Sequence, residues 1–528
     1  MNPFFYLFAV VLTLQMLGCR EPPPELASVG ELPTVVPTSG DETSSSSSSS
    51  PSGVESSTTS DAGAQRPPPL TQPLGWDEDI RLPEAEDLDP DPNVLEVNIQ
   101  AREEEIELLP GVKTRMWTYN GLVPGPLLRA KRGDRLIVHF TNQLPEPTTI
   151  HWHGVEVPAS MDGTSAMQDP VKSGETFTYD YIIPDSGTFW YHPHINSSSQ
   201  VGYGLYGPLI VNEPEEPIAA DELVLVLSDV SLDEMGQLNP GDHLDWFGDY
   251  FGREGNLQLL NGKVLPRLRA QAGVPQRWRV INASRSRLFK MSVPGVPLVR
   301  IGGDGGLSER PLPIDSLILA ASERAELWVV APPETQGEIE VLSEDGDRFG
   351  LGFPEPPKPL ILLDVIDEGP VATVELPSQL RTLTALDTTM AKTRRIEFGE
   401  VEVDGVGHLA INGHVFAAED GSDAGTGHEH EHGATHVAYV GDTEIWEVVN
   451  TTDYQHPFHL HGFSFQVLEQ SGVPWPVLEW KDTVNVLPQS SVKLVVDFDD
   501  RPGLWMFHCH ILDHAKLGML AVLSVQHP

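Results

Sequence analysis

The segment WMFHCHILDHAKLGM, residues 505–519, determines how the rest of the chain is interpreted. Side chains alternate between the two faces of a strand, so His508 and His510 would share one face and Cys509 would take the other. His514 follows the cysteine by five residues and Met519 by ten. Two histidines, one cysteine and a weak axial methionine are the ligands of a blue-copper electron-transfer centre. The cysteine, the last histidine, the methionine and one more histidine from elsewhere are therefore expected to bind one copper, which leaves the first two histidines for another metal.

Ten of the 19 histidines lie in four short motifs, each containing a pair of histidines separated by one residue. Imidazole suits copper, and strands that carry such pairs can direct eight imidazoles to one place. Two motifs lie early in the chain and two near its end, so we expect them to meet at an interface between the first and third domains. The alternative is a set of unrelated buried or surface histidines. The four motifs are HWHG at 151–154, YHPH at 191–194, HPFHLHG at 456–462 and HCHILDH at 508–514.

An internal repeat predicts three copies of one domain. Gly133, Gly273 and Gly441 each precede a β-rich run that ends at an asparagine nine residues later. In the first and third copies a His-x-His-Gly motif also ends 21 residues after that glycine. The middle copy has lost the histidines.

The pattern of apolar runs and turn residues along the chain predicts an all-β protein. After Pro92, short runs rich in Val, Ile and Leu are separated by Gly, Pro, Asn and Asp, and none has an extended helical period. Evenly spaced short strands are typical of β-sandwiches and barrels. We expect domains at 93–215, 216–375 and 376–528, the middle one without copper ligands.

The charge of the chain excludes one class of partner. Acidic residues number 77 against 33 basic ones, giving a net charge of −44. Phosphate binding requires the opposite sign, so no nucleic-acid partner is expected.

The N-terminus predicts export. The apolar run at 4–17 is too short to span a membrane comfortably and ends in Met16-Leu17-Gly18-Cys19, which looks like a bacterial lipobox. Residues 1–19 are thus expected to be a signal peptide with Cys19 as the lipidated residue, the lipid being the only membrane attachment. A plain secretory signal or a short anchor is the alternative. Residues 20–92, rich in Pro, Ser and Glu, are expected to be a disordered tether. The protein would be periplasmic or at the cell surface. By resemblance to other lipoproteins the outer membrane is favoured, because the residue after Cys19 is Arg20 and not the aspartate of a retention signal.

The four motifs resemble those of the multicopper oxidases, in particular the three-domain bacterial group that includes laccases, bilirubin oxidase and copper-efflux oxidase. The resemblance covers roughly residues 93–528. It implies three consecutive cupredoxin-like Greek-key β-sandwich or barrel domains and four copper ions. It further implies that type 1 copper is held by His456, Cys509, His514 and Met519, type 2 by His151 and His459, one type 3 by His153, His192 and His510, and the other type 3 by His194, His461 and His508.

The resemblance also implies a reaction. Electrons taken singly from a reductant at type 1 copper would pass through Cys509 to His508 and His510, and four of them would reduce O2 to two waters. Asp162, after the first motif, matches a position where relatives use a carboxylate to deliver protons; the alternative is an Asp-Gly turn residue. A second acidic residue, common just after the type 1 histidine, is replaced by Ala515. Whether Asp513 serves instead is left open.

A stretch rich in His and Glu within the expected last domain suggests a further metal site. His428, His430, His432 and His436 could bind extra Cu or Zn; the alternative is a polar solvated loop. No methionine lies among residues 452–455, just before His456. In the copper-efflux oxidases that the chain resembles, methionines near type 1 copper bind Cu(I). The resemblance therefore favours a laccase-like oxidase of phenols or aromatic amines over a cuprous or other metal-ion oxidase for envelope copper tolerance. A non-catalytic copper-binding or electron-carrying lipoprotein is the third possibility, although a carrier needs only type 1.

Overall fold

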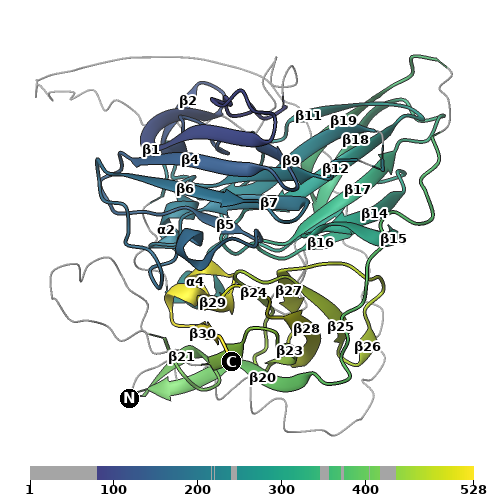
Figure 1. Cartoon of the computed structure of the whole chain (residues 1–528). Coiled ribbons are helices and arrows are strands. Elements are labelled where there is room, and N and C mark those ends of the chain that lie inside the picture. The colour runs from purple at the N-terminus through teal and green to yellow at the C-terminus, as the bar shows by residue number, and fades with distance from the viewer. Residues whose placement is uncertain are drawn as a thin grey trace, which may run out of the picture. The chain divides into compact units, whose positions relative to one another are not determined.

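The computed structural model describes most of the chain beyond its N-terminal segment. The described residues are 80–215, 217–218, 220–239, 246–344, 356–369, 374–403, 405–416 and 436–528. The predicted signal peptide with Cys19, most of the predicted tether, and His428, His430 and His432 lie outside them. The described part is built of strands, which confirms the all-β prediction (Figure 1).

Three pairs of sheets follow one another along the chain, within residues 94–212, 221–366 and 392–526. We call them the first, second and third domains; the exact boundaries given above remain predictions. In the first domain the sheet orders are β2-β1-β4-β6 and β3-β8-β7-β5. Its strands are β1 (Val94–Leu109), β2 (Val112–Tyr119), β3 (Leu128–Lys131), β4 (Arg135–Asn142), β5 (His151–His153), β6 (Thr176–Ile182), β7 (Gly187–His192) and β8 (Gly207–Asn212).

The second domain has a six-stranded sheet, β10-β9-β12-β17-β14-β15, and a five-stranded sheet, β11-β19-β18-β13-β16. Its strands are β9 (Asp221–Val230), β10 (Leu257–Leu260), β11 (Arg267–Gln271), β12 (Pro275–Asn282), β13 (Phe289–Ser292), β14 (Leu298–Gly303), β15 (Gly306–Ile314), β16 (Leu317–Leu319), β17 (Arg324–Val330), β18 (Gly337–Glu344) and β19 (Lys358–Ile366).

The third domain has the same arrangement, with sheet orders β21-β20-β23-β28-β25-β26 and β22-β30-β29-β24-β27. Its strands are β20 (Lys392–Val403), β21 (Val406–Ile411), β22 (His436–Tyr439), β23 (Thr443–Asn450), β24 (His456–Leu460), β25 (Phe465–Gln470), β26 (Val473–Pro474), β27 (Thr483–Val486), β28 (Ser490–Asp497), β29 (Gly503–Cys509) and β30 (Leu520–Gln526).

Helices are short in the described residues and connect strands. None is long and apolar enough to cross a membrane in the part of the chain that the structure describes. The helices are η1 (Ala159–Met161), α2 (Ser197–Gly202), α3 (Trp246–Phe251) and α4 (Leu512–Lys516).

The repeated Gly-strand-Asn pattern corresponds to the same strand in each domain. β4, β12 and β23 each contain eight residues and pair in parallel with the preceding long strand, β1, β9 or β20. The closing asparagine ends the strand by the same bonds: Nδ2 of Asn142 donates to two carbonyls at 2.8 Å, while Oδ1 accepts from the N–H two residues on. Asn282 and Asn450 make the same bonds, so the asparagine satisfies backbone groups that the strand leaves unpaired.

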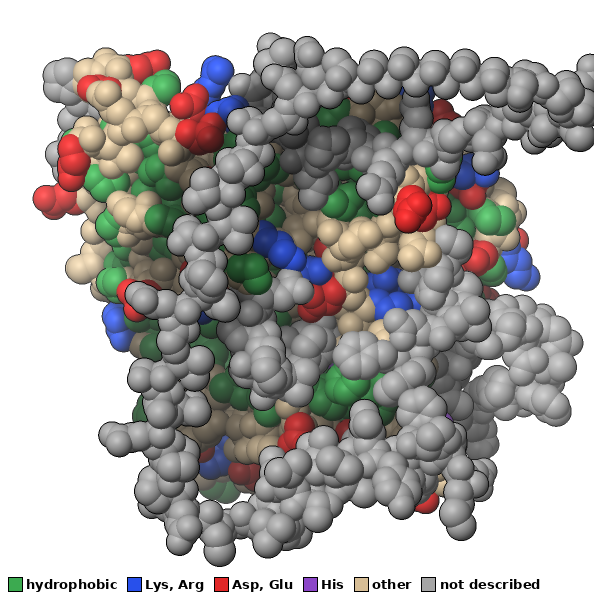
Figure 2. All heavy atoms as spheres, turned by 180° about the vertical axis from the view of Figure 1, so that it is seen from behind, with side chains coloured by type: hydrophobic (Ala, Val, Ile, Leu, Met, Phe, Trp, Pro, Cys, Tyr) green, Lys and Arg blue, Asp and Glu red, His purple; other side chains and the backbone are tan. Residues whose placement is uncertain are grey.

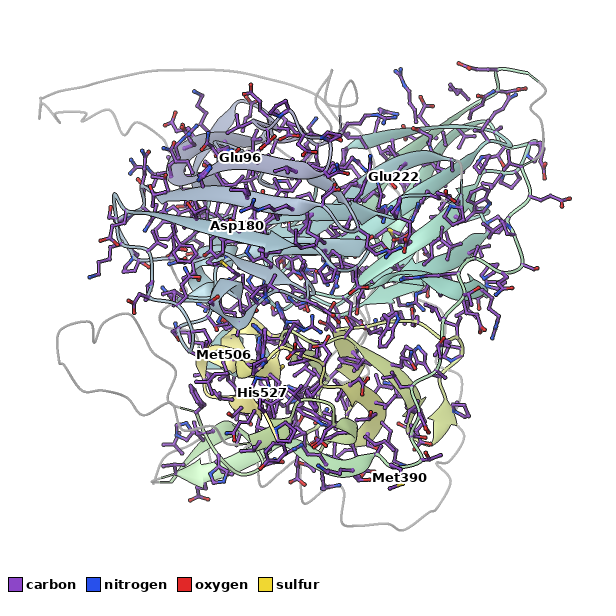
Figure 3. The ribbon with its side chains drawn as sticks, in the orientation of Figure 1. Glu96, Asp180, Glu222, Met390, Met506 and His527 are labelled. Carbon is purple, nitrogen blue, oxygen red and sulfur yellow. The ribbon has the colours of Figure 1, made fainter. Side chains whose placement is uncertain are left out.

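Each domain has its own apolar core, and one further cluster joins the domains. That cluster contains Met116 of the first domain, Leu259 of the second and Leu512 on α4 of the third. Polar contacts reinforce the junction: Glu222, labelled in Figure 3, accepts from Arg129 of the first domain and from Arg279, both at 2.7 Å. On the surface, acidic side chains occur at several separated places on the described face shown in Figure 2.

The last part of the predicted tether packs on the folded body. The N–H of Ala85 donates to the carbonyl of Leu127 at 2.9 Å, and the N–H of Leu127 donates to Pro83 at 2.8 Å. Ala85 also packs against the first-domain core, and Ile80 against that of the second. Residues 80–92, which their composition assigned to the tether, therefore contact the folded body, and apolar side chains among the acidic ones give them surface to bury.

Candidate metal centre

A sulfur and two imidazoles converge in the third domain. β24 and β29 are neighbours in one sheet, with Phe458 opposite Cys509. Nδ1 of His456 lies 3.3 Å from Sγ of Cys509, Nδ1 of His514 lies 3.5 Å from the same sulfur, and the two nitrogens are 3.2 Å apart. All three side chains are buried. Met519 is also fully buried, and its carbonyl accepts from the N–H of Cys509 at 3.1 Å. The structure thus brings together the sequence-predicted thiolate site.

The surroundings fix the orientation of these imidazoles. Nε2 of His456 lies 2.9 Å from Oγ1 of Thr452, so Nδ1 faces the sulfur. The ring of Tyr454 packs on both imidazoles, with centroids 4.8 Å from His456 and 5.7 Å from His514. A metal-ligating histidine usually donates its second N–H in this way, which sets its tautomer.

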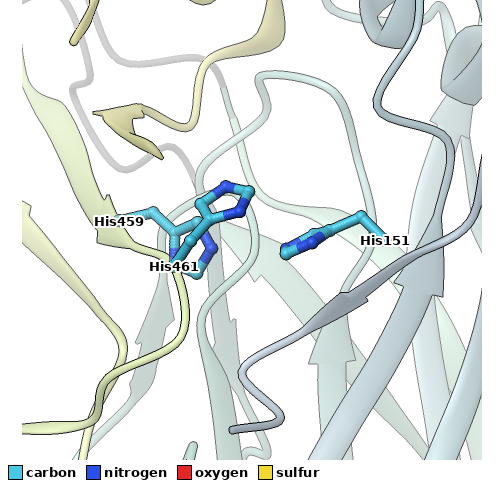
Figure 4. Close-up of side chains that lie close together, drawn as sticks. All are labelled: His151, His459 and His461. Carbon is cyan, nitrogen blue, oxygen red and sulfur yellow. The ribbon is translucent and has the colours of Figure 1, made fainter. Parts of the chain in front are cut away.

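The eight remaining motif histidines gather between the first and third domains. In β5 and β7 His151 lies opposite His192, and in β24 and β29 His459 lies opposite His508. Rings from the two domains stack directly: His153 on His459 with centroids 3.8 Å apart, and His151 on His461 at 4.0 Å. Figure 4 shows His151 facing His459 and His461. The interface prediction is therefore met by the geometry.

Three groups of these histidines have ligand atoms within 4.8 Å of one another. The groups overlap, as expected of a single compact site for several metals. They are His151 with His459 and His461, His151 with His153 and His192, and His194 with His461 and His508.

The donor atoms fit a metal site better than a hydrogen-bonded core. Burial, the largest cause, lowers the pKa of His194 to about 3 and the pKa values of His508 and His510 well below the ordinary value. Neutral imidazole is the form that binds metal. Leaving a buried nitrogen unsatisfied costs roughly 1–3 kcal/mol. Yet several have no hydrogen-bond partner among the described residues: Nε2 of His151, His192 and His459, Nδ1 of His153, and both ring nitrogens of His510.

Two buried carboxylates hold the outer edges of the imidazoles. Oδ2 of Asp162 accepts from Nδ1 of His461 at 2.9 Å, and Oδ1 lies 3.2 Å from Nδ1 of His151. Oδ1 of Asp482 accepts from Nε2 of His153 at 3.0 Å. Burial acts to raise the pKa of Asp162, but the imidazoles of His461 and His151 outweigh it, and the pKa lies well below its ordinary value. Asp162 is thus more than a turn residue, although it does follow η1.

Asp513 forms a buried ion pair that links the three domains. Its Oδ2 accepts from the backbone N–H of Arg253 at 2.7 Å, and its Oδ1 accepts from Nε of Arg253 at 3.1 Å and from the hydroxyl of Ser198. Burial acts to raise the pKa of Asp513, and Arg253 lowers it below its ordinary value. The carboxylate therefore joins α4, which carries His514, to the first and second domains.

Sequence reasoning missed Asp482 and its partner Arg324, because neither belongs to a histidine motif. Nη1 of Arg324 donates to Oδ1 of Asp482 at 2.8 Å, although the two residues are 158 positions apart. The available signal was the charged pair Lys481-Asp482 just before the short β-rich run at residues 483–486. A buried charge requires a partner, and no partner is identifiable from sequence spacing.

Comparisons with known proteins agree with this geometry. Family models described as multicopper oxidase match residues 100–216 and 409–528. A multicopper oxidase of Mycobacterium tuberculosis is 29% identical over 77% of this chain and 82% of its own, and a laccase of Bacillus subtilis is 28% identical over 79% and 91%. The solved structure of a metallo-oxidase from Campylobacter jejuni is 30% identical, with a TM-score of 0.74 over 85% of this chain and 94% of that one.

Three paired-sheet domains with a thiolate site beside a shared histidine site define a copper-dependent oxidoreductase. The chain belongs to the multicopper oxidase family. Enzymes of this family carry four copper ions, of types 1, 2 and 3, and act on O2 together with a reducing substrate or metal ion.

Proposed function

We propose that the chain oxidises phenols or aromatic amines and reduces O2, with the ligand assignment that the resemblance implies. Two described groups support that assignment. His456, Cys509 and His514 are three of the four predicted type 1 ligands, and His194, His461 and His508 are one predicted type 3 set. Type 2 would then be held by His151 and His459, and the other type 3 ion by His153, His192 and His510. When bound, copper supplies the one-electron oxidation and the reduction of O2.

The chain's own contribution is a short covalent connection. Cys509 directly follows His508 and precedes His510, so one strand end reaches both sites. Nδ1 of His508 donates to the carbonyl of Cys509 at 2.9 Å, which adds a hydrogen-bonded route from the cysteine backbone to the imidazole. All three side chains are buried, so water is excluded from this route.

A cavity of about 420 Å³ beside the type 1 ligands carries the substrate proposal. Ligand pockets of this size are typically apolar with a few polar groups. The cavity adjoins Met519, because the N–H of Phe416 donates to the carbonyl of Gly518 at 3.0 Å and Leu520 forms part of the wall. The lining is Ile411, Asn412, His414, Val415, Phe416, His436, Leu520 and Ala521, which suits a small aromatic ring.

Replacing Phe416 by Ala tests this site. An aromatic contact contributes about 0.5–1.5 kcal/mol, so KM for a phenol should rise about 2- to 12-fold while the blue absorption is kept. Val473→Ala, at a position 66% exposed on β26, is the control and should leave KM unchanged. An unchanged KM in Phe416→Ala would place phenol binding elsewhere.

A metal-ion reductant, Cu(I) above all, is the second candidate. His414 and His436 both line the cavity, and burial lowers the pKa of His436 to about 4, so its imidazole is neutral at pH 7. The amide of Asn412 lies 3.1 Å from Nε2 of His436. One solved relative is described as a metallo-oxidase, and one sequence relative as a copper resistance protein A homologue. Oxygen uptake with Cu(I) that falls in His414→Ala/His436→Ala, while phenol oxidation persists, would favour this candidate.

Export and lipidation at Cys19 are part of the same proposal. A lipid on Cys19 would hold the folded body at a membrane surface, facing the periplasm or the cell exterior. Cell fractionation tests it: the parent protein should sediment with membranes, and Cys19→Ser should be recovered in the soluble exported fraction. Equal partition of both proteins would contradict lipidation.

A further inference from the structure

We propose that Arg324, in the second domain, is a positioning residue for the shared histidine site and determines whether type 2 copper is retained. The inference rests on the ligand assignment proposed above. The second domain supplies none of the predicted copper ligands, so the ligand assignment alone gives it no part in binding copper. The buried ion pair between Arg324 and Asp482 gives it a direct part in the metal centre.

Arg324 is fully buried, and its two terminal nitrogens contact both carboxylate oxygens of Asp482. Nη1 donates to Oδ1 of Asp482 at 2.8 Å and Nη2 donates to Oδ2, so the pair is bidentate. Nε donates to the carbonyl of Thr188 in the first domain at 2.7 Å. A planar guanidinium in a two-point contact fixes the plane of the carboxylate as well as its position. One side chain of the second domain thereby ties together the first and third domains.

Asp482 in turn contacts one histidine of the first domain and one of the third. Its Oδ1 accepts from Nε2 of His153, and its backbone carbonyl accepts from Nδ1 of His459, both at 3.0 Å. Thr483 supports the same two nitrogens, with Oγ1 at 3.1 Å from each. The opposite nitrogens, Nδ1 of His153 and Nε2 of His459, are those with no partner among the described residues. Because Nε2 of His153 and Nδ1 of His459 are held by hydrogen bonds, the opposite nitrogens of both rings have a fixed direction.

Further buried charged groups surround Arg324. Oδ1 of Asp304 accepts from the backbone N–H of Arg324 at 2.9 Å, and its Oδ2 lies 3.1 Å from Nζ of Lys481. Glu323 lies 3.4 Å from the same Nζ. Two buried cations thus meet three buried carboxylates, and removing Arg324 leaves Asp482 without its main partner. A carboxylate without this two-point contact is no longer held in one orientation, and its reorientation disturbs the imidazoles that it supports.

The test compares Arg324→Gln with Arg277→Gln in copper-loaded full-length protein. Arg277 is a matched control, since it is buried in the same sheet and its carboxylate partner, Glu326, bonds to Thr188 and arginines rather than to a histidine. Copper per chain and the electron paramagnetic resonance spectrum are measured. Arg324→Gln should lose about one copper per chain and the type 2 signal while keeping type 1 absorption, and Arg277→Gln should keep both.

The outcomes separate the inference from the assignment beneath it. A type 2 signal at parental strength in Arg324→Gln, or equal loss in Arg277→Gln, overturns the role of Arg324. A parent protein that itself lacks the type 2 signal overturns the proposed assignment instead. If Arg324→Gln does not fold, as judged by missing type 1 absorption, Arg324→Lys decides. Lysine keeps the charge without the two-point contact, so a chelator should remove type 2 copper faster than from the parent, and an equal rate overturns the inference.

Discussion

A Cβ atom on Gly154 would lie 2.6 Å from Nη2 of Arg324. Gly154 closes the first His-x-His-Gly motif and has a φ of +85°. The glycine therefore serves two purposes: it adopts the left-handed turn after His153, and it leaves room for the buried pair of Arg324 with Asp482.

Gly154→Ala should destabilise the protein by more than the turn conformation alone requires. A left-handed alanine costs roughly 1–2 kcal/mol, and crowding in a packed interior adds about 1–3 kcal/mol. Gly441→Ala is the control, because its φ of +86° is nearly the same and a Cβ there meets nothing within 4 Å. Chemical unfolding of both variants measures the difference, and equal losses would show that the pair can move aside.

Cys509→Ser should remove the blue absorption and abolish oxidation of every reductant. The hydroxyl is a poor copper ligand compared with thiolate, whereas the interface histidines are untouched. Copper analysis should therefore give about three ions per chain instead of the four that the family carries. Persistent colour in the variant would exclude Cys509 as the type 1 ligand.

Thr452→Val should weaken type 1 copper without unfolding the domain. Oγ1 of Thr452 lies 2.9 Å from Nε2 of His456, and valine has the same shape without the acceptor. Loss of such an outer partner typically costs about 10- to 100-fold in metal affinity. Titration with a chelator, followed through the visible band, measures the change; Thr443→Val, at the start of β23, is a control remote from this imidazole.

Asp162→Ala should slow O2 consumption by about 100-fold if the carboxylate delivers protons. The Asp162 side chain is fully buried and accepts from Nδ1 of His461 of the third domain, while its backbone carbonyl accepts from Nδ1 of His151 at 2.8 Å. The hypothesis fails if the variant oxidises substrate and consumes O2 at the parental rate. Copper content is measured alongside, since loss of copper would make the carboxylate a structural support of the imidazoles instead of a proton donor.

The sequence was sufficient for the fold class and for the gathering of the histidines, because both depend on repeated local patterns. The Gly-strand-Asn repeat predicts equivalent strands, and each asparagine indeed makes the same strand-ending bonds. Alternation along β29 predicts that Cys509 and His508 point to opposite faces, and they lie in different groups of ligand atoms.

Contacts between distant residues could not be predicted. Arg324 and Asp482 meet only because three domains fold together, and nothing in their spacing indicates it. Which ring nitrogen stays without a hydrogen bond is equally unpredictable from the sequence. His153 leaves Nδ1 and His459 leaves Nε2, because the carboxylate of Asp482 accepts from Nε2 of His153 while its backbone carbonyl accepts from Nδ1 of His459. The contacts of residues 80–92 with the folded body could not be predicted either, because composition does not reveal which few apolar side chains, such as Ile80 and Ala85, pack against a core.

The wide separation of the ligands along the chain has a consequence for biogenesis. His151 and His510 are separated by 359 residues, so the shared histidine site cannot be complete on a nascent chain before residue 510 has been added. Metal insertion into this site must therefore wait for the third domain. A nonsense codon between residues 195 and 455 would yield a product that contains the four imidazoles of the first domain but none of the four that the third domain contributes.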